Sequence, residues 1–172
     1  MSDFSLFERA YALLENVTPR RYDCGRLCGS RCCQNLSAGV SPAESSMRLL
    51  PHEKEYLQSI GAENFTYCSS DDGDFLLCGG HCDRAFRPFA CRIFPYYAHF
   101  DESRVFLRAD IRAAICPLVT TRACCRLTPR FLRNAKKAVR ILAAEPLILE
   151  DMKKNAAFVD SLYELYEQLK PL

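Results

Sequence analysis

The stretch CGGHCDRAFRPFACRIFP, at residues 78–95, holds three cysteines, one histidine, three arginines and two prolines. Two of the three residues between Cys78 and Cys82 are glycines, so the backbone there can turn tightly and approach a bound ion closely. Each proline fixes its own φ angle and favours extended geometry in the residue before it. Because thiols at fixed points of a constrained backbone are suited to binding a metal ion, the stretch predicts half of a metal site.

A second block of cysteines, YDCGRLCGSRCCQNL at residues 22–36, supplies the other half. Cys24, Cys28 and Cys32 recur every fourth residue, and a glycine follows each of the first two. These glycines favour loops or a single turn over a continuous helix. Cys33 follows Cys32 directly, and neighbouring side chains point to opposite sides of an extended chain. One of this pair therefore serves a second metal, bridges a cluster or packs in the core.

The number of cysteines, eleven, is high for a chain that starts without a basic segment followed by an apolar one. The lack of such a signal predicts a cytoplasmic protein, and disulfides do not persist in a reducing cytosol. An odd count also leaves no fully paired disulfide framework. Scattered cysteines can pack as small hydrophobic residues, but clustered ones favour metal ligation.

The predicted ligand set combines the two blocks with Cys116, which precedes Pro117. Four thiolates suit one tetrahedral zinc ion or one cubane iron–sulfur cluster, so eight suit two such sites. We predict zinc, with iron or a 4Fe–4S cluster as the alternative, because thiolate suits both metals. His81 could replace a thiolate, since imidazole also binds zinc. The predicted metal ligands are Cys24, Cys28, Cys32, Cys33, Cys78, Cys82, Cys91 and Cys116.

Other residues near the thiols have predicted roles of a different kind. Arg87 and Arg92 lie among prolines and apolar residues, so we expect them to donate hydrogen bonds to thiolates or to backbone oxygens. Cys68 precedes a turn and is left outside the site. Cys124 and Cys125 are also left outside, either as a redox-sensitive pair or as buried residues at the start of a helix.

The clusters CGRLCGSRCC at 24–33 and CGGHCDRAFRPFACRIFP at 78–95, with CP at 116–117, resemble the CxxCxxCC family of zinc- or iron-chelating domain proteins. That family is similar, in its cysteine region, to flagellin lysine N-methylase. The resemblance covers residues 22–117, and RPxxCRxFP at 87–95 is its most specific part. Three residues, rather than two, separate the first cysteines here. The resemblance implies that the eight cysteines are the ligands, and it implies a site rather than an activity.

Helical periodicity predicts helices at both ends of the chain. Residues 3–16 form the first, with Asp3 or Ser5 as its cap. A second helix starts with Thr128 as cap and Pro129 as its first residue. Its predicted apolar face is Phe131, Leu132, Ala135, Ala138, Val139 and Leu142. Residues 146–170 form the last helix. Its predicted inward residues are Ile148, Met152, Val159, Leu162, Tyr166 and Leu169.

The middle of the chain has shorter elements. Residues 37–50 are rich in turn residues and predict a surface connection. Residues 51–60 predict a helix that begins with Pro51, has a solvated His52 and ends at Gly61. Segments 65–67 and 75–77 flank the turn signal CSSDDGD and predict a hairpin, and 105–107 predicts a strand.

These patterns together predict a mostly α fold with a few short strands. We expect one metal-stabilised domain over 1–172, in which a cysteine-rich, loop-rich region (22–117) is packed by terminal helices that include a C-terminal pair (128–170). The net charge is +2, from 23 basic and 21 acidic residues, which gives no reason to expect nucleic acid as a partner. No apolar run reaches the length of a membrane span, and no protein partner can be identified.

The metal-binding interpretation leaves the ion either structural or carried as cargo. One alternative is a metal- or cluster-dependent enzyme related to protein lysine methylation. The chain contains no GxGxxG loop, no HExxH and no CxxxCxxC, so no catalytic residue is predicted. The other alternative is a zinc module that binds protein or nucleic acid, suggested by the basic run RFLRNAKKAVR at 130–140.

Overall fold

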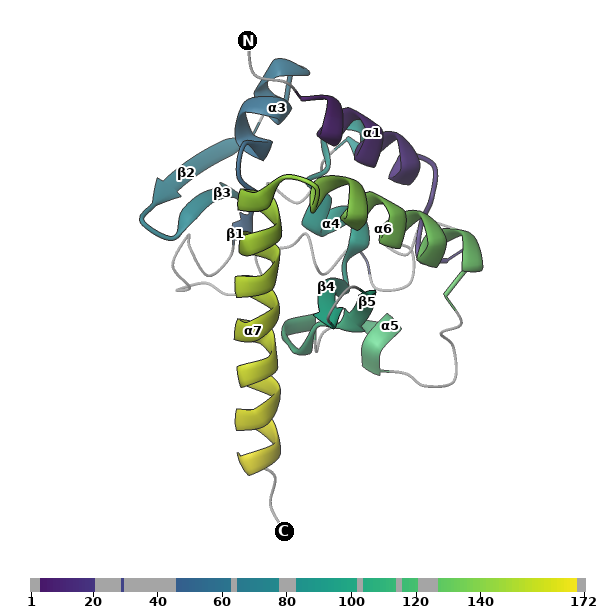
Figure 1. Cartoon of the computed structure of the whole chain (residues 1–172), viewed down its shortest axis with the longest axis vertical. Helices are drawn as coiled ribbons and strands as arrows, with labels where there is room; N and C mark the ends of the chain where they lie inside the picture. Colours follow the sequence, from purple (N-terminus) through teal and green to yellow (C-terminus); the bar gives the residue numbers. More distant parts are fainter. Residues whose placement is uncertain are drawn as a thin grey trace.

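The computed structural model describes residues 4–20, 29, 46–62, 65–77, 83–101, 104–113, 116–120 and 127–169. Within these ranges helices prevail and the strands are short and antiparallel, which confirms the mostly α prediction (Figure 1). The elements are α1 (Ser5–Leu14), β1 (Ser46–Arg48), α3 (Glu53–Ser59), β2 (Thr66–Ser70), β3 (Gly73–Leu77), η2 (Arg84–Phe86), α4 (Phe89–Ile93), β4 (Tyr96–Asp101), β5 (Arg104–Ala109), η3 (Ile111–Ala113), α5 (Pro117–Thr120), α6 (Pro129–Leu142) and α7 (Pro146–Leu169). None of the helices in these ranges is long and apolar enough to cross a membrane.

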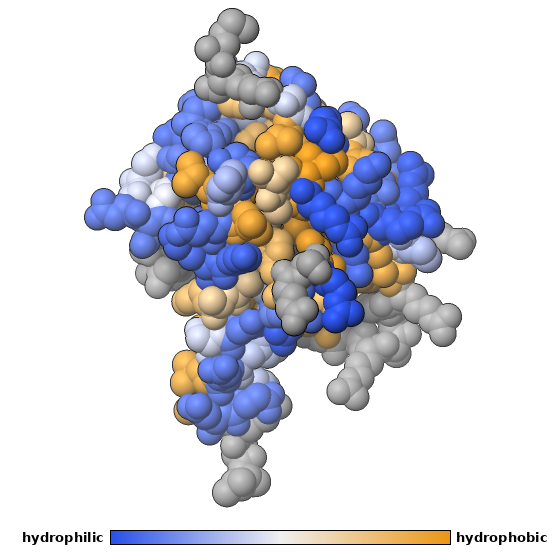
Figure 2. All heavy atoms as spheres, in the orientation of Figure 1, coloured by the Kyte–Doolittle hydropathy of each residue, from blue (hydrophilic) through white to orange (hydrophobic). Residues whose placement is uncertain are grey.

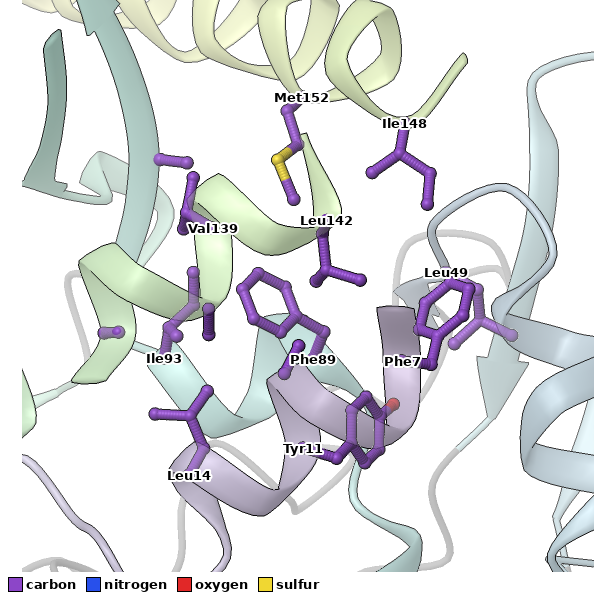
Figure 3. Packing of buried hydrophobic residues seen from close by; sticks show 14 of the residues in the cluster. Phe7, Tyr11, Leu14, Leu49, Phe89, Ile93, Val139, Leu142, Ile148 and Met152 are labelled. Atoms are coloured by element: carbon purple, nitrogen blue, oxygen red, sulfur yellow. The ribbon is translucent and has the colours of Figure 1, made fainter. Parts of the chain in front are cut away.

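The main core lies where α1 and α6 pack side by side (Figure 1). Figure 3 shows side chains from α1, α4, α6 and α7 converging there, with the ring of Phe89 near the middle. Burying a large apolar side chain contributes about 1.5–3 kcal/mol, so this cluster supplies much of the driving force for folding. The buried residues from α1 and α6 are Phe7, Ala10, Tyr11, Leu14, Phe131, Ala135, Ala138, Val139 and Leu142.

Helix α6 begins as its sequence predicts. The Thr128 hydroxyl accepts a hydrogen bond from the Phe131 amide at 3.3 Å, and Pro129 is the first helical residue. Its predicted apolar face is buried apart from Leu132, which is half-buried. Helix α1 begins at Ser5 after Phe4, without a side-chain cap, so Ser5 is the first helical residue and not the predicted cap. Asp3, the other predicted cap, lies outside the described residues.

Strands β2 and β3 form the predicted hairpin, and β1 pairs with the other edge of β3 to give the order β1-β3-β2. Ser46–Arg48 therefore belongs to a strand and not to the predicted surface connection. The segment is short and polar, so its own sequence shows no strand pattern and does not predict its pairing with β3. Strands β4 and β5 form a separate antiparallel pair, and the predicted strand at 105–107 lies inside β5.

Helix α3 begins two residues later than predicted. Pro51 and His52 form a turn, His52 has a φ of 66° and is exposed, and the first helical residue is Glu53. Pro51 is therefore not the first residue of the helix. Gly61, with a φ of 87°, follows the end of α3 as predicted, because glycine adopts this left-handed conformation readily.

Helix α7 is fixed to the body over most of its length. Asp160 accepts hydrogen bonds from the Tyr97 hydroxyl at 2.7 Å and from Arg108 at 2.8 Å, and its other oxygen lies 3.0 Å from Nε2 of His99. The Tyr163 hydroxyl donates to the carbonyl of Ala109 at 2.8 Å. Beyond Tyr163 the helix continues past the rest of the fold, as its lower, yellow end shows in Figure 1. Tyr166 and Leu169 are exposed as a result, so their predicted inward positions are wrong.

Candidate metal centre

Two of the eight predicted ligands, Cys91 and Cys116, lie in the part of the chain that the structure describes. Among those described residues, no group of three or more Cys, His, Asp or Glu side chains is placed to hold a metal ion. The described residues form the scaffold around these two thiols. The predicted ligands outside the described residues are Cys24, Cys28, Cys32, Cys33, Cys78 and Cys82, and His81, Cys124 and Cys125 lie outside them as well.

Cys91 lies on α4, a helix of little more than one turn. Phe89, Arg92 and Ile93 of this helix are buried, whereas Cys91 is half-buried. The thiol therefore lies away from the most buried face of the helix. A helix this short has little stability of its own, so its position depends on the contacts around it.

Arg92 holds the backbone that precedes α4. Its Nε donates to the carbonyl of Arg87 at 2.7 Å, and its Nη2 donates to the carbonyls of Arg84 and Ala85 at 2.9 and 2.8 Å. The residue is only 3% exposed, and burial lowers the pKa of its guanidinium. The prediction that Arg92 donates to backbone oxygen is therefore confirmed. Its guanidinium fixes the backbone that leads into α4 by binding three carbonyls there.

Glu53 holds the start of α4. It is the first residue of α3 and is completely buried, yet its carboxylate accepts from the backbone amides of Leu50 at 2.8 Å and Phe89 at 2.6 Å. Burial raises the pKa of Glu53, while these hydrogen bonds and the charge of Arg92 act in the opposite direction. The bond to Phe89 satisfies an amide at the start of α4 that has no partner within the helix.

Tyr11 of α1 connects the two buried charges. Its hydroxyl donates to the Glu53 carboxylate, and the guanidinium carbon of Arg92 lies 4.1 Å from the centre of its ring. Burial, together with the neighbouring carboxylate, raises the pKa of Tyr11 well above its ordinary value. The three side chains therefore join α1, α3 and α4 through one buried polar contact set, which we call the Glu53–Tyr11–Arg92 cluster.

The stretch at 78–95 is also attached to the end of α1. Arg84 donates to the carbonyl of Leu14 at 3.0 Å and to those of Glu15 and Val17. These carbonyls lie at or just after the C-terminal end of α1, where backbone oxygens lack helical partners and a positive charge is favourable. Asn134 of α6 donates to the carbonyl of Leu13 at 2.7 Å, so two distant segments complete the same helix end.

Cys116 is buried in a small apolar cluster with Ala113 and Leu118, and partly buried Phe94 packs against that cluster. Its backbone amide donates to Ala113 at 2.8 Å, and its carbonyl accepts from Val119 at 3.0 Å. Phe94 lies three residues after Cys91, and its bond to Pro95 is cis. The structure therefore brings the surroundings of Cys116 to the end of the same stretch that carries Cys91.

Cys68 has a different setting, on β2 of the hairpin. Its sulfur lies 3.9 Å from the carbonyl of its cross-strand partner Phe75, which is a weak hydrogen bond at most. Cys68 is half-buried, like Cys91, but it is not part of α4 or of the Cys116 cluster. This pair of half-buried thiols offers a matched comparison for the metal experiments below.

Sequence reasoning identified Arg92 but missed Glu53 and Tyr11 as partners of the RPxxCRxFP segment. Glu53 matched the usual preference for acidic residues in the first turn of a helix, which implies an exposed side chain. Tyr11 matched an ordinary core position. No local pattern marks either residue, because the contact set joins segments that are far apart in the chain.

Comparison with known proteins adds no relative to these observations. No protein-family model matches the chain, and neither a curated protein nor a solved structure matches it. The likeness to the CxxCxxCC family therefore remains a prediction from the cysteine motifs.

Proposed function

We propose that this chain is a metal-binding protein that coordinates zinc through its clustered cysteine thiolates, with the ion either structural or carried as cargo. Iron, or a 4Fe–4S cluster, is the alternative, because thiolate ligands suit these metals too. The proposed ligands are the eight cysteines of the predicted set. The resemblance of residues 87–95 to the CxxCxxCC family is one line of support.

The observation that carries the proposal is the way the RPxxCRxFP segment is held. A single turn of helix bears Cys91, and buried Glu53 and Arg92 fix the backbone that leads into it. Burying a carboxylate and a guanidinium costs free energy of desolvation. A functional role of the short turn that they position would account for this cost. Preorganisation of a ligand is such a role, since metal sites depend on hydrogen bonds behind the ligands as much as on the ligands.

The deciding experiment is elemental analysis with a UV–visible spectrum of protein purified without oxygen. A colourless protein with about one or two zinc ions per chain supports the proposal. A brown protein with broad visible absorbance supports the iron–sulfur alternative. Protein that is folded and holds none of these metals would contradict the proposal.

Cys91→Ser is expected to reduce the metal content, whereas Cys68→Ser is expected to leave it unchanged. Both thiols are half-buried, so the two changes are matched in chemistry and in burial, and they differ in the scaffold that presents the sulfur. Serine replaces a soft thiolate by a hydroxyl that binds zinc poorly. The double change of Cys124 and Cys125 to serine is a second control. Equal loss from all three proteins would show that the ligand set is drawn wrongly.

Removing the metal with a chelator is expected to speed hydrogen exchange over residues 22–117 more than over α6 and α7. The two helices have continuous buried faces of their own, whereas the cysteine blocks contain few long periodic segments and depend on ligation for order. Hydrogen–deuterium exchange with mass spectrometry measures this directly. Uniform protection with and without chelator would contradict a structural ion, and metal loss under those conditions would favour cargo.

A further inference from the structure

Basic residues are concentrated in one part of the chain. Residues 111–144 contain eight of the 23 lysines and arginines and none of the 21 aspartates and glutamates. The net charge of +2 is therefore the sum of a basic segment and a remainder that is acidic. Helix α6 lies inside this segment and carries five of its eight basic residues.

Four of the basic residues on α6 form a row along the outer side of the helix. They are three or four residues apart, or about 4.5–6 Å along the axis, so they share one side. All four are exposed, and within the described ranges none forms an ion pair or a hydrogen bond through its side chain. Figure 2 shows hydrophilic side chains, in blue, over the place where α6 lies in Figure 1. This α6 row consists of Arg130, Arg133, Lys137 and Arg140.

The opposite face of α6 is closed by the main core. A helix that binds a membrane surface inserts its own apolar face among the lipids. That face of α6 is already buried within the fold, so the helix can offer a partner only its charged side. A membrane is therefore a poorer partner for the α6 row than a charged polymer. The buried residues of α6 are Phe131, Ala135, Ala138, Val139 and Leu142.

An aromatic ring, that of Phe106 on β5, lies beside the basic side of α6. The ring is half-buried, and Nζ of Lys136 and the guanidinium carbon of Arg104 each lie 5.8 Å from its centre. These distances are near the outer limit of a cation–π contact. Lys136 directly precedes Lys137 of the row, so the ring and the row are parts of one surface. Proteins that bind single-stranded nucleic acid combine cations that follow the phosphates with aromatic rings on which bases stack.

We propose that the α6 row and Phe106 bind single-stranded nucleic acid without sequence preference, with phosphates on the row and a base on the ring. A phosphodiester chain repeats one negative charge at short intervals, which complements a row of cations with no acid among them. Three of the four residues of the row are arginines, whose planar group binds phosphate through two hydrogen bonds. The ring favours nucleic acid over an acidic protein segment, which has no base to stack on it. This surface lies outside the predicted cysteine ligands, so this proposal and the proposed metal binding can fail separately.

The test is fluorescence anisotropy of the full chain with a labelled oligothymidylate of about 20 nucleotides, at a series of salt concentrations. Wild type is expected to bind, more weakly as salt rises, because each phosphate that the protein neutralises releases counterions. Four phosphate contacts predict that the logarithm of the binding constant falls with the logarithm of the salt concentration with a slope of about −3.

Two variants separate the contribution of charge from that of stacking. R133Q/K137Q is expected to weaken binding by about tenfold or more at low salt and to make the slope shallower by about 1.4, since two phosphate contacts are lost. Phe106→Leu is expected to weaken binding by about fivefold or more at an unchanged slope, since it removes a stacked base and no charge.

The matched control is K153Q/K154Q, which removes two exposed positive charges from α7 and should leave the affinity and the slope unchanged. Circular dichroism and metal content are expected to match wild type in every variant, because the changed side chains are exposed or half-buried. Wild type that does not bind the oligonucleotide at low salt would overturn the proposal. An equal loss from the control would do so too, since the binding would then not belong to α6. Polyglutamate that binds as tightly as the oligonucleotide, with Phe106→Leu unaffected, would indicate an acidic protein as the partner instead.

Discussion

Replacing Glu53 with alanine is expected to lower the free energy of unfolding by about 3–5 kcal/mol. The carboxylate is completely buried and accepts hydrogen bonds from the Tyr11 hydroxyl and from the amides of Leu50 and Phe89. Its removal leaves these three donors without the carboxylate, removes a negative charge from the surroundings of Arg92, and opens a cavity. Urea denaturation followed by circular dichroism measures the change.

The matched control is Glu55→Ala, in the same helix two residues later. Glu55 is exposed, so its loss is expected to change stability by no more than about 0.5 kcal/mol. Glu53→Gln is expected to fall between the two, because the amide oxygen can still accept from Tyr11 and Phe89 while its nitrogen faces the amide of Leu50. If Glu53→Ala and Glu55→Ala are equally stable, the Glu53–Tyr11–Arg92 cluster does not hold the fold together.

Arg92→Ala is expected to weaken metal retention by about 10–100-fold, although arginine cannot be a ligand. Arg92 lies directly after Cys91 and collects three carbonyls from residues 84–87. Without the guanidinium these carbonyls lose their donors, and the backbone that positions the thiol can relax. A competition titration against a metal chelator, on protein purified without oxygen, measures the loss.

Arg92→Lys is expected to restore little of that retention. Lysine lacks the planar fork that reaches several carbonyls at once, and its ammonium would be left buried with fewer partners. Arg104→Ala is the control, since Arg104 is exposed on β5, where it forms an ion pair with Asp101. Equal retention by wild type and both Arg92 variants would mean that Arg92 serves the fold alone.

Much of the local structure could be predicted from short segments of sequence. Thr128 and Pro129 mark the start of α6 because hydroxyl capping and the fixed φ of proline act within one helical turn. The hairpin of β2 and β3 follows from a turn signal between two apolar segments, and Gly61 ends α3 through its positive φ. In each case the deciding interactions lie within a few residues of one another.

The errors arise where distant segments decide. Residues 46–48 form β1 because they pair with the free edge of β3. Glu53 can be buried because Tyr11 of α1 and Phe89 of α4 donate hydrogen bonds to its carboxylate. On α7 the apolar period continues to Leu169, but the body to which it could pack ends earlier. Helical periodicity shows that one face is apolar, and it cannot show whether a partner is present.

The sequence predicts which residue types form the candidate site, but it does not predict how they are arranged in space. Clustered thiols and the RPxxCRxFP segment predict ligands, and the backbone-binding role of Arg92 follows from its place between two prolines. The buried partners of that segment come from Tyr11 and Glu53, whose local patterns indicate an ordinary core residue and an ordinary helix start. Six of the eight predicted ligands lie outside the described residues, so their arrangement stays a prediction.

The way α1 ends also constrains when the chain can fold. Arg84 and Asn134, which donate to carbonyls at the end of α1, lie 70 and 121 residues from their acceptors. A ten-residue helix is marginal in water without tertiary contacts, so α1 is completed only after α6 has been synthesised. During synthesis on the ribosome, α1 is therefore completed only after about three quarters of the sequence has emerged, and contacts at such separation make folding slow.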